Sequence, residues 1–297
     1  RRQRQMCIRD RSQFIVTGGA TLTASNISIN VTTEFEADKK VKPVGSGSNV
    51  FFTFNKGNFS GVREFFVASD TDTKKADDIT ANVPKFIPAN VFKLATSTTE
   101  NILIALSSDE DNALYVFQYY VAQNKRLQSA WHKWTYGSTT SDKILNIDFI
   151  ENTLFIVNER SDGVYLETID VSPALTDTGE SYLTHLDRKI NNTQITESYN
   201  AGTNQTTLTL PYAINNTMKV VGKSGASNKA GQEIATISQS GTSIVVSGDI
   251  TAQNFFIGEQ YEFEFQFSQQ FIQVADSVGS RISVKEGRLQ IRNWSVS

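Results

Sequence analysis

The sequence predicts an all-β protein, in which a partial β-propeller-like domain of hairpin repeats is followed by a second small, sandwich-like β domain. Three observations support this prediction. The chain is rich in Thr, Ser, Asn and Phe but holds five prolines and two methionines, short apolar runs alternate with polar turns, and one hairpin pattern recurs. Its 297 residues suffice for about two domains. No stretch approaches the roughly 18 consecutive apolar residues that a membrane-spanning helix needs.

The start of the chain differs from the rest in composition. The first eleven residues hold five arginines and one aspartate, a net charge of +4, so the overall charge of −3 leaves −7 for the remainder. Three interpretations are open: a basic arm for nucleic acid, a disordered tail, or sequence that is not native to the protein. We favour the last and predict that residues 1–9 are non-native or disordered. The single cysteine, Cys7, excludes an internal disulfide and a cysteine-based metal site.

Residues 10–171 are predicted to form β-propeller-like blades, because one hairpin pattern recurs in them. Residues 102–117 (ILIALSSDEDNALYVF) and residues 144–157 (ILNIDFIENTLFIV) both read as a strand, a turn with Asn at its end, and a second strand. The earlier stretch 49–67 has the same layout as residues 152–171. A period of about 40 to 45 residues, with about four strands per unit, is typical of propeller blades.

The remaining segments complete the predicted organisation. The polar residues 70–88 are predicted to be a long connection between blades, since they contain two prolines and few apolar residues. Residues 172–193 are predicted to be the connection to the second β domain, at residues 194–297, which we expect to be truncated at its C-terminal end. Within it, EQYEFEFQFS at residues 259–268 alternates acidic or amide residues with aromatic ones, which predicts a strand with one face in water.

The most distinctive local stretch is SAWHKWTYGS, which holds two of the three tryptophans and one of the two histidines. Catalysis by His132 would need an orienting partner and a nucleophile, and the other histidine lies in the predicted connection. No GxSxG, HExxH or P-loop motif occurs. The indoles could stack on sugars or bases, but large aromatic residues in a blade strand more often fill the space between blades. We therefore predict no catalytic residue and interpret Trp131, His132, Trp134 and Tyr136 as a structural core motif.

Acidic residues offer two further candidate sites. The turn DEDN at residues 109–112 could present oxygens to calcium, but it lacks the ligand spacing of an EF-hand loop, and we favour a solvated hairpin turn. Asp77 and Asp78 could form a metal site or a carboxylate pair, and we favour an Asp that caps a turn. The sequence therefore predicts no metal and no cofactor. We attribute its seven N-x-S/T sequons to an abundance of Asn, Ser and Thr.

Basic residues are sparse after the start, with small clusters at residues 39–42 and at Lys74 and Lys75. Affinity for duplex DNA comes largely from Lys and Arg that neutralise phosphates, so a body of charge −7 is expected to hold DNA weakly. This argues against a DNA-binding protein. It does not argue against a channel wall, which must not bind tightly to the DNA that passes along it.

Eight stretches of the chain, in order, resemble the tail tubular protein B family, the nozzle proteins of short-tailed bacteriophages (podoviruses). They are DRSQFIVTGG (10–19), VTTEFEADKKVKPVGSGSNVFF (31–52), GVREFF (61–66), DDITANVPKFIP (77–88), SAWHKWTYGS (129–138), DGVYLETIDV (162–171), IGEQYEFEFQFS (257–268) and GRLQIRNWSV (287–296). The resemblance covers residues 10–297. Members of the family are longer at both ends, so this sequence resembles an internal fragment of a longer protein.

The resemblance implies a structural protein of the virion tail that is not an enzyme. It implies a hexameric ring of copies of the chain, forming the nozzle through which the genome is ejected into the host. The implied partners are the tail adaptor protein, the tail fibres, passing duplex DNA and the host envelope. The alternative is a glycan-binding or glycan-cleaving phage propeller protein, which would need a carboxylate pair or a Tyr nucleophile with an arginine cluster.

Overall fold

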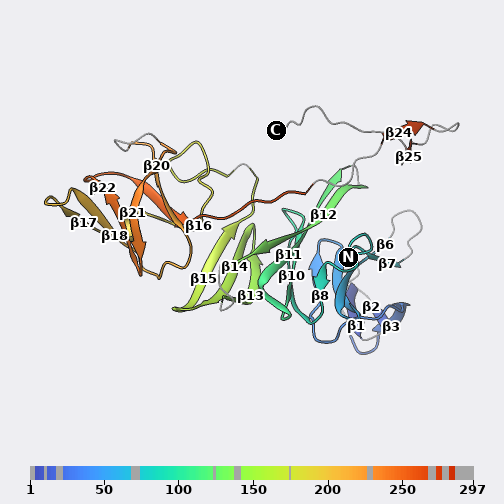
Figure 1. Cartoon of the computed structure of the whole chain (residues 1–297). Coiled ribbons are helices and arrows are strands. Elements are labelled where there is room, and N and C mark those ends of the chain that lie inside the picture. Colours follow the sequence, from blue (N-terminus) through green and yellow to red (C-terminus); the bar gives the residue numbers. More distant parts are fainter. Residues whose placement is uncertain are drawn as a thin grey trace. The chain divides into compact units, whose positions relative to one another are not determined.

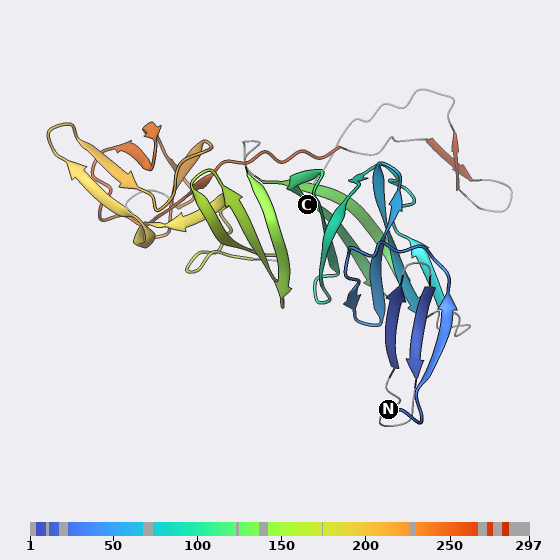
Figure 2. The ribbon, with the colours of Figure 1, turned by 90° about the horizontal axis from the view of Figure 1, so that it is seen from below.

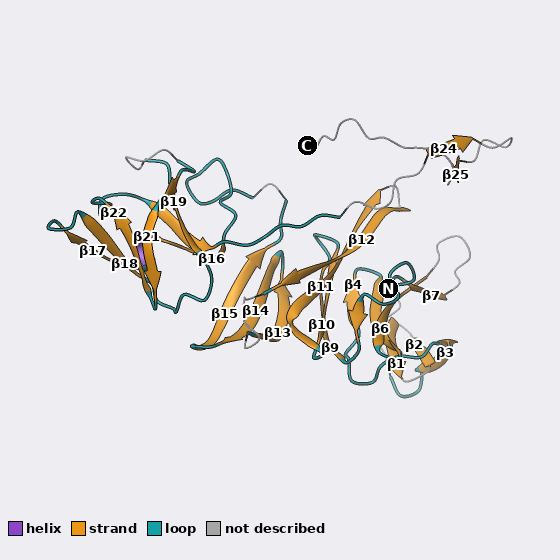
Figure 3. Cartoon of the chain, viewed as in Figure 1, coloured by secondary structure: helices purple, strands orange, loops and turns teal. Residues whose placement is uncertain are grey.

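Strands make up almost all of the regular structure in the computed structural model (Figure 3). The structure describes residues 4–9, 12–17, 23–67, 74–122, 125–136, 142–173, 175–225, 230–266, 272–275 and 281–284. Over these residues the single helical element is a short 3₁₀ turn, η1 (Asn192–Gln194), and no helix is long and apolar enough to cross a membrane. The all-β prediction is confirmed. The chain divides into two compact units, Arg1–Gln260 and Tyr261–Ser297.

Sheet A contains the start of the chain, which the sequence predicted to be non-native or disordered. Its antiparallel strands are β1 (Arg4–Arg9), β2 (Ser12–Thr17) and β3 (Ser28–Thr33). β1 pairs with β2 from Arg4 opposite Thr17 to Arg9 opposite Ser12. Residues 4–9 lie in this paired strand, since backbone pairing does not depend on side-chain charge. The interpretation of residues 1–9 as non-native or disordered stays a prediction.

Sheet B contains the first predicted hairpin and part of the predicted connection. Its strands are β4 (Val44–Ser46), β5 (Asn49–Lys56), β6 (Phe59–Val67), β7 (Lys74–Asp78) and β8 (Ile87–Pro88). β7 and β8 both pair with β6, so residues 70–88 are not a simple connection. Sequence reasoning missed β7 because KKADD has one apolar residue, Ala76, and that residue is buried.

Sheets C and D contain the other predicted hairpins, which are confirmed. Sheet C consists of β9 (Val91–Ser97), β10 (Ile102–Ser107), β11 (Glu110–Ala122) and β12 (Lys125–Thr135). Sheet D consists of β13 (Lys143–Ile150), β14 (Thr153–Arg160) and β15 (Gly163–Asp170). In both sheets consecutive strands pair antiparallel through short turns, and each sheet can be followed as a separate group of arrows in Figure 2.

Sheets B, C and D share two apolar cores in chain order. One core joins sheet B to sheet C and includes Phe51, Leu103 and Tyr115. The other joins sheet C to sheet D and includes Ile104 and Ile156. Because successive side chains of a strand point to opposite faces, β10 contributes to both cores, and this explains its uninterrupted apolar run ILIAL. The stack agrees with hairpin repeats, while closure into a propeller stays a prediction.

Two four-stranded sheets follow and share a third core, with Leu208 and Val246 from one sheet and Val220 and Phe255 from the other. Sheet E consists of β16 (Asp187–Asn191), β23 (Phe255–Glu259), β19 (Met218–Gly222) and β20 (Glu233–Ile234). Sheet F consists of β17 (Thr196–Asn200), β18 (Gln205–Thr209), β22 (Ser243–Ser247) and β21 (Thr236–Ser240). We call this pair of sheets the sandwich (Figure 1). Its first strand, β16, lies in the range predicted as a connection, and the predicted domain limits stay predictions.

The second unit contains sheet G, in which β24 (Ile272–Ala275) pairs with β25 (Arg281–Val284). The strand predicted from the alternation in EQYEFEFQFS is not formed at residues 261–266, where the structure has no strand and Phe263 is 82% exposed. Alternation makes a segment suitable for a half-buried sheet, but a strand also needs a neighbour to accept its backbone hydrogen bonds. The resembling stretch GRLQIRNWSV (287–296) lies outside the described residues.

Candidate functional site

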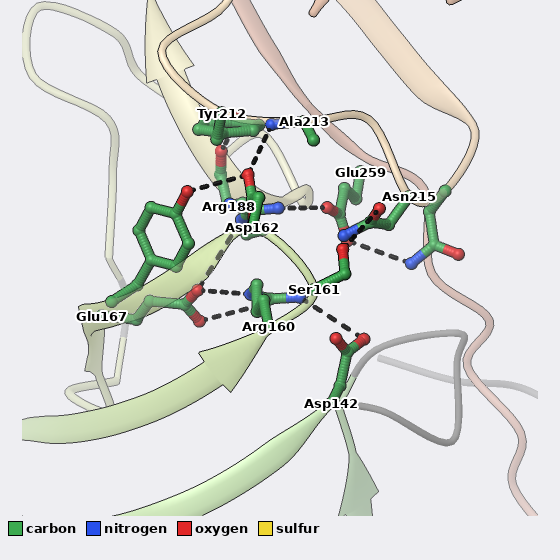
Figure 4. Close-up of polar contacts among 12 residues, drawn as sticks. Asp142, Arg160, Ser161, Asp162, Glu167, Arg188, Tyr212, Ala213, Asn215 and Glu259 are labelled. Carbon is green, nitrogen blue, oxygen red and sulfur yellow. Dashed lines mark hydrogen bonds and ion pairs between the residues drawn. The ribbon is translucent and has the colours of Figure 1, made fainter. Parts of the chain in front are cut away.

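A group of buried charged side chains lies where sheet D meets the sandwich (Figure 4). We call Asp142, Arg160, Glu167, Arg188 and Glu259 the ionic junction. Asp142 directly precedes β13, the next two residues come from β14 and β15, and the last two come from β16 and β23. Charged groups are rarely this buried unless they are paired, so the junction is the most unusual chemical feature of the described residues.

Arg160 is the first of two arginines in the junction. Its side chain is 2% exposed, and it donates two hydrogen bonds to the carboxylate of Glu167, from Nε over 2.9 Å and from Nη2 over 3.0 Å. This bidentate arrangement is the strongest form of an ion pair between arginine and a carboxylate. Figure 4 shows the guanidinium between Glu167 and Asp142, whose Oδ2 lies 3.9 Å from Nη1.

Arg188 connects sheet D to the sandwich. Its Nη1 donates to Glu259 over 3.1 Å, and its Nε lies 3.7 Å from an oxygen of Glu167. The guanidinium carbon lies 3.8 Å from the ring centre of Tyr212, and the Tyr212 hydroxyl donates to the Arg188 carbonyl over 2.8 Å. Asn216 donates to the second oxygen of Glu259 over 3.0 Å. Arg188 is therefore held by charge, by an aromatic face and through its own backbone.

The backbone around Arg188 is bent to aim its side chain into the junction. β16 is irregular between Asp187 and Ile190, and Arg188 has a left-handed φ of 46°. Such a bulge re-aims side chains, and a non-glycine residue at positive φ is held by its surroundings. Gly258 of β23 makes the bend possible, because a Cβ there would lie 2.7 Å from the Asp187 carbonyl oxygen and 2.7 Å from Leu186 Cβ.

Asp162, in the turn between β14 and β15, adds a second link to the sandwich. Its Oδ2 accepts a hydrogen bond from the Tyr165 hydroxyl over 2.8 Å and another from the Ala213 backbone N–H over 2.8 Å. Although burial opposes the shift, these two donors hold the pKa of Asp162 below its usual value. The charged carboxylate is therefore the form that links the turn to the sandwich.

The junction shifts the pKa values of its members in opposite directions. Burial alone would lower the pKa of Arg160, but Glu167, with Glu259 and Asp142, holds that pKa above its usual value. Asp187 lies beside the junction and is exposed as a residue, but partial loss of water around its carboxyl group, followed by the negative charge of Glu259, raises its pKa to about 6. Burial also raises the pKa of Tyr212 to about 12, so its hydroxyl keeps its proton and can donate. The junction thus holds an arginine that stays charged, and the neighbouring Asp187 has a carboxyl group that titrates near neutral pH.

These contacts fit a structural joint better than a reaction centre. Both guanidinium groups are engaged by carboxylates of the same chain, so neither is presented to a ligand in solvent. Over the residues that the structure describes, no group of three or more His, Cys, Asp or Glu side chains is placed to hold a metal ion. The chemistry available to the junction is to hold sheet D and the sandwich together through charge.

The structure places the predicted aromatic motif on both faces of β12. Trp131 packs against the core between sheets B and C, where its Nε1 donates to the Ile79 carbonyl over 2.9 Å. Trp134 and Tyr136 pack against the core between sheets C and D. The His132 ring centre lies 5.5 Å from that of Trp134, and burial lowers its pKa.

One member of this motif reaches the ionic junction. Burial, with the charges of Asp187 and Glu167, raises the pKa of Tyr136 far above its usual value. Sequence reasoning missed the junction itself. Its clearest signal was the scarcity of arginine after the start, since Arg160 and Arg188 stand alone in polar stretches.

The other candidate residues lie apart from the junction. Asp78 Oδ2 forms an ion pair with Lys56 at 2.7 Å, and Asp78 Oδ1 accepts a 2.8 Å hydrogen bond from the Thr80 backbone. It therefore caps a turn, as the sequence favoured. In the turn at residues 109–112, Asp109 accepts from Asn90 over 2.8 Å, and Glu110 forms a 2.8 Å ion pair with Lys133. These residues belong to a hairpin at the surface.

Comparison with known proteins adds an independent line of evidence. A family model described as bacteriophage nozzle protein matches residues 6–297. Tail tubular protein gp12 of Escherichia phage T7 is 27% identical over 290 residues, which are 95% of this chain and 36% of that protein. A solved structure of Kluyveromyces lactis Hsv2p has a TM-score of 0.33 and 12% identity, over 70% of this chain and 67% of that one. At that TM-score the likeness carries no argument.

Proposed function

Because the chain belongs to the bacteriophage nozzle protein family, we propose that it is a structural part of the virion tail and acts without catalysing a reaction. The observation that carries this proposal is the family match over nearly the whole chain. The relative from phage T7, which is also named for a tail tube, supports the same location. The chain spans 36% of that relative's length, so the proposal concerns the longer protein of which such a segment forms part.

In this proposal, copies of the longer protein assemble into a hexameric ring that forms part of the nozzle. The genome leaves through the ring, and the tail adaptor and tail fibres attach near it. The nozzle contacts the host envelope at infection. The acidic balance of the chain, −7 after its first eleven residues, supports weak contact with passing duplex DNA, because phosphate binding depends on Lys and Arg. We further propose residues 10–171 as propeller-like blades, residues 172–193 as the connection and residues 194–297 as the second domain.

The ionic junction has a role in this proposal as a rigid joint. A wall that bears load needs fixed angles between its parts. A buried pair of arginines that binds carboxylates from β15, from β23 and from Asp142 before β13 fixes orientation more strictly than an apolar contact does. The aromatic motif Trp131, His132, Trp134 and Tyr136 then acts as packing between blades.

Light scattering on the full-length protein tests the ring. We expect a hexamer, and we expect deletion of residues 194–297 to reduce assembly, because contacts between subunits would come from loops and from this second domain. A DNA titration at about 50 and 200 mM salt should show weak, salt-sensitive binding without sequence preference. A monomeric full-length protein, or tight sequence-specific binding, would contradict the nozzle proposal. Release of sugar from a glycan array would support the glycan alternative instead.

A further inference from the structure

Five buried polar atoms at one end of β14 have no hydrogen-bond partner within the described residues. They are both carboxylate oxygens of Asp142, both amide atoms of Asn158, and Nη1 of Arg160. The three residues are 1%, 0% and 5% exposed, respectively. Buried polar side-chain atoms are usually hydrogen-bonded, so five such atoms on three neighbouring residues indicate that a small ligand binds between them.

The three residues lie together on one face of sheet D. Asn158 and Arg160 are two positions apart on β14, so their side chains share a face. Lys143 pairs with Glu159 across the strands, which brings Asp142, the preceding residue, opposite Arg160. Asp142 Oδ2 lies 3.9 Å from Arg160 Nη1, and Figure 4 shows this side of the guanidinium turned toward Asp142.

The gap between Arg160 and Asp142 has the size of a bridged contact. A separation of 3.9 Å is too long for a direct hydrogen bond, and polar contacts beyond about 3.5 Å are commonly bridged by water. Arg160 cannot close the gap by turning, because its other edge is held by two hydrogen bonds to Glu167.

The site contains hydrogen-bond donors, hydrogen-bond acceptors and two opposite charges, and this combination indicates which ligand fits it. The three oxygen atoms of Asp142 and Asn158 accept hydrogen bonds, whereas the Asn158 amide nitrogen and Arg160 Nη1 donate them. A cation would be repelled by the guanidinium, and an anion would be repelled by the Asp142 carboxylate. Water is neutral and both donates and accepts hydrogen bonds. We therefore propose that Asp142, Asn158 and Arg160 form a buried hydration site. In this site, ordered water completes their hydrogen bonds and holds the side of the Arg160 guanidinium that faces Asp142.

Replacement of Asn158 by Leu tests this proposal through the sign of its effect. If water joins the three residues, Asn158→Leu removes two of its partners, and the thermal midpoint should fall by at least about 2 °C. If the site is dry, the same change removes an unsatisfied amide from an apolar surrounding, and the midpoint should stay or rise. That second result would overturn the proposal.

Thr53→Val is the matched control. Thr53 is 2% exposed, its Oγ1 also lacks a hydrogen-bond partner among the described residues, and it lies opposite Val62 across sheet B. No other such atom lies on its strand pair, so we expect a dry position where the substitution leaves or raises the midpoint. A fall for Asn158→Leu without a fall for Thr53→Val would support the hydration site.

Two measurements on the wild-type chain decide the case even if Asn158→Leu does not fold. A crystal structure that resolves water should show it within about 2.7 to 3.2 Å of both Arg160 Nη1 and an Asp142 oxygen, and empty density there would overturn the proposal. Thermal midpoints should be equal in sodium, potassium and calcium chloride at matched ionic strength. A rise specific to one cation, lost in Asp142→Asn, would assign the site to that cation and overturn the proposal.

Discussion

One face of sheet D has opposite chemistry at its two ends: it packs against sheet C through apolar side chains of β14, and it meets the sandwich through Glu167, which Arg160 of β14 holds and which lies 3.7 Å from Arg188. Near the start of the strand, Leu154 and Ile156 are fully buried in the core shared with sheet C. Farther along, Asn158 and Arg160 are just as deeply buried, but Arg160 pairs with Glu167 in the ionic junction. One face of one strand thus changes from an apolar contact to an ionic contact within four residues.

Because of this difference, the two contacts should respond differently to substitutions and to pH. Apolar packing is non-directional and roughly proportional to the area buried, so it weakens gradually when a side chain is shortened. An ionic contact that is out of water is stable only while each charge has its partner, and removal of one partner leaves the other buried and uncompensated. The ionic junction should therefore be the more sensitive to single substitutions and the only one of the two that depends on pH.

Arg188→Met is expected to have the largest effect. It leaves Glu259, whose side chain is 4% exposed, without its cation, and loss of one partner of a buried pair costs about 3–5 kcal/mol. Urea unfolding of the 297-residue chain measures the loss. The double variant Arg188→Met with Glu259→Gln should recover a substantial part of it, because the uncompensated charge is gone. Equal losses in the single and double variants would show that packing, and not charge, dominates at this contact.

Ile156→Ala should weaken the apolar contact by about 3 kcal/mol, since it opens a cavity in the core between sheets C and D. Ile156→Val should cost about 1 kcal/mol, which would show the gradual response. Ile150, at the end of β13, is 64% exposed, and Ile150→Ala serves as the control with a change within about 0.5 kcal/mol. A loss for Ile156→Ala no larger than that of the control would contradict the assignment of this core.

Gly258→Ala should cost about 1–3 kcal/mol by overpacking. The added Cβ would meet the Asp187 carbonyl oxygen and Leu186 Cβ, both at 2.7 Å, and the bulge that aims Arg188 would have to move. Gly45→Ala is the control in sheet B, because the nearest atom to its added Cβ would lie at 4.0 Å. If both variants unfold at the same urea concentration as the wild type, the bulge accommodates the added Cβ without loss of stability, and the overpacking argument is wrong.

The smallest effect is expected from the titration of Asp187, because this residue is exposed and water screens its charge. Partial loss of water around its carboxyl group and the nearby Glu259 raise its pKa to about 6 in the folded chain, whereas an unfolded Asp has a pKa of about 3.9. The folded state therefore binds the proton more tightly, so this contribution is complete below pH of about 4 and is lost as the pH rises through about 6.

Urea midpoints measured between about pH 4 and pH 7 test this sign. The wild type should lose stability relative to Asp187→Asn as the pH rises through about 6, because His132 and the other titrating groups are present in both proteins. Asp170→Asn, at the exposed end of β15, should leave that loss unchanged. The same pH profile in the wild type and in Asp187→Asn would show that the proton of Asp187 does not contribute to the junction.

Local patterns in the sequence were sufficient to predict the individual hairpins and the family. The hairpins at residues 102–117 and 144–157 follow from alternation and from turn residues a few positions apart, and the all-β prediction is confirmed. The ordered series of resembling stretches identified the nozzle family, and the family match over residues 6–297 confirms it. These features are readable because the residues that produce them are close together in the chain.

The strands formed by polar segments, and the ion pairs between distant residues, depend on long-range contacts in the folded chain. The Lys-rich β7 forms because β6 offers it an edge, whereas residues 261–266 alternate well and form no strand. Arg188 and Glu259 are 71 positions apart, and nothing in their local sequence marks them as partners. A strand needs a neighbour, and a buried charge needs a counter-charge. Both needs are met by segments distant in sequence, so local pattern does not reveal them.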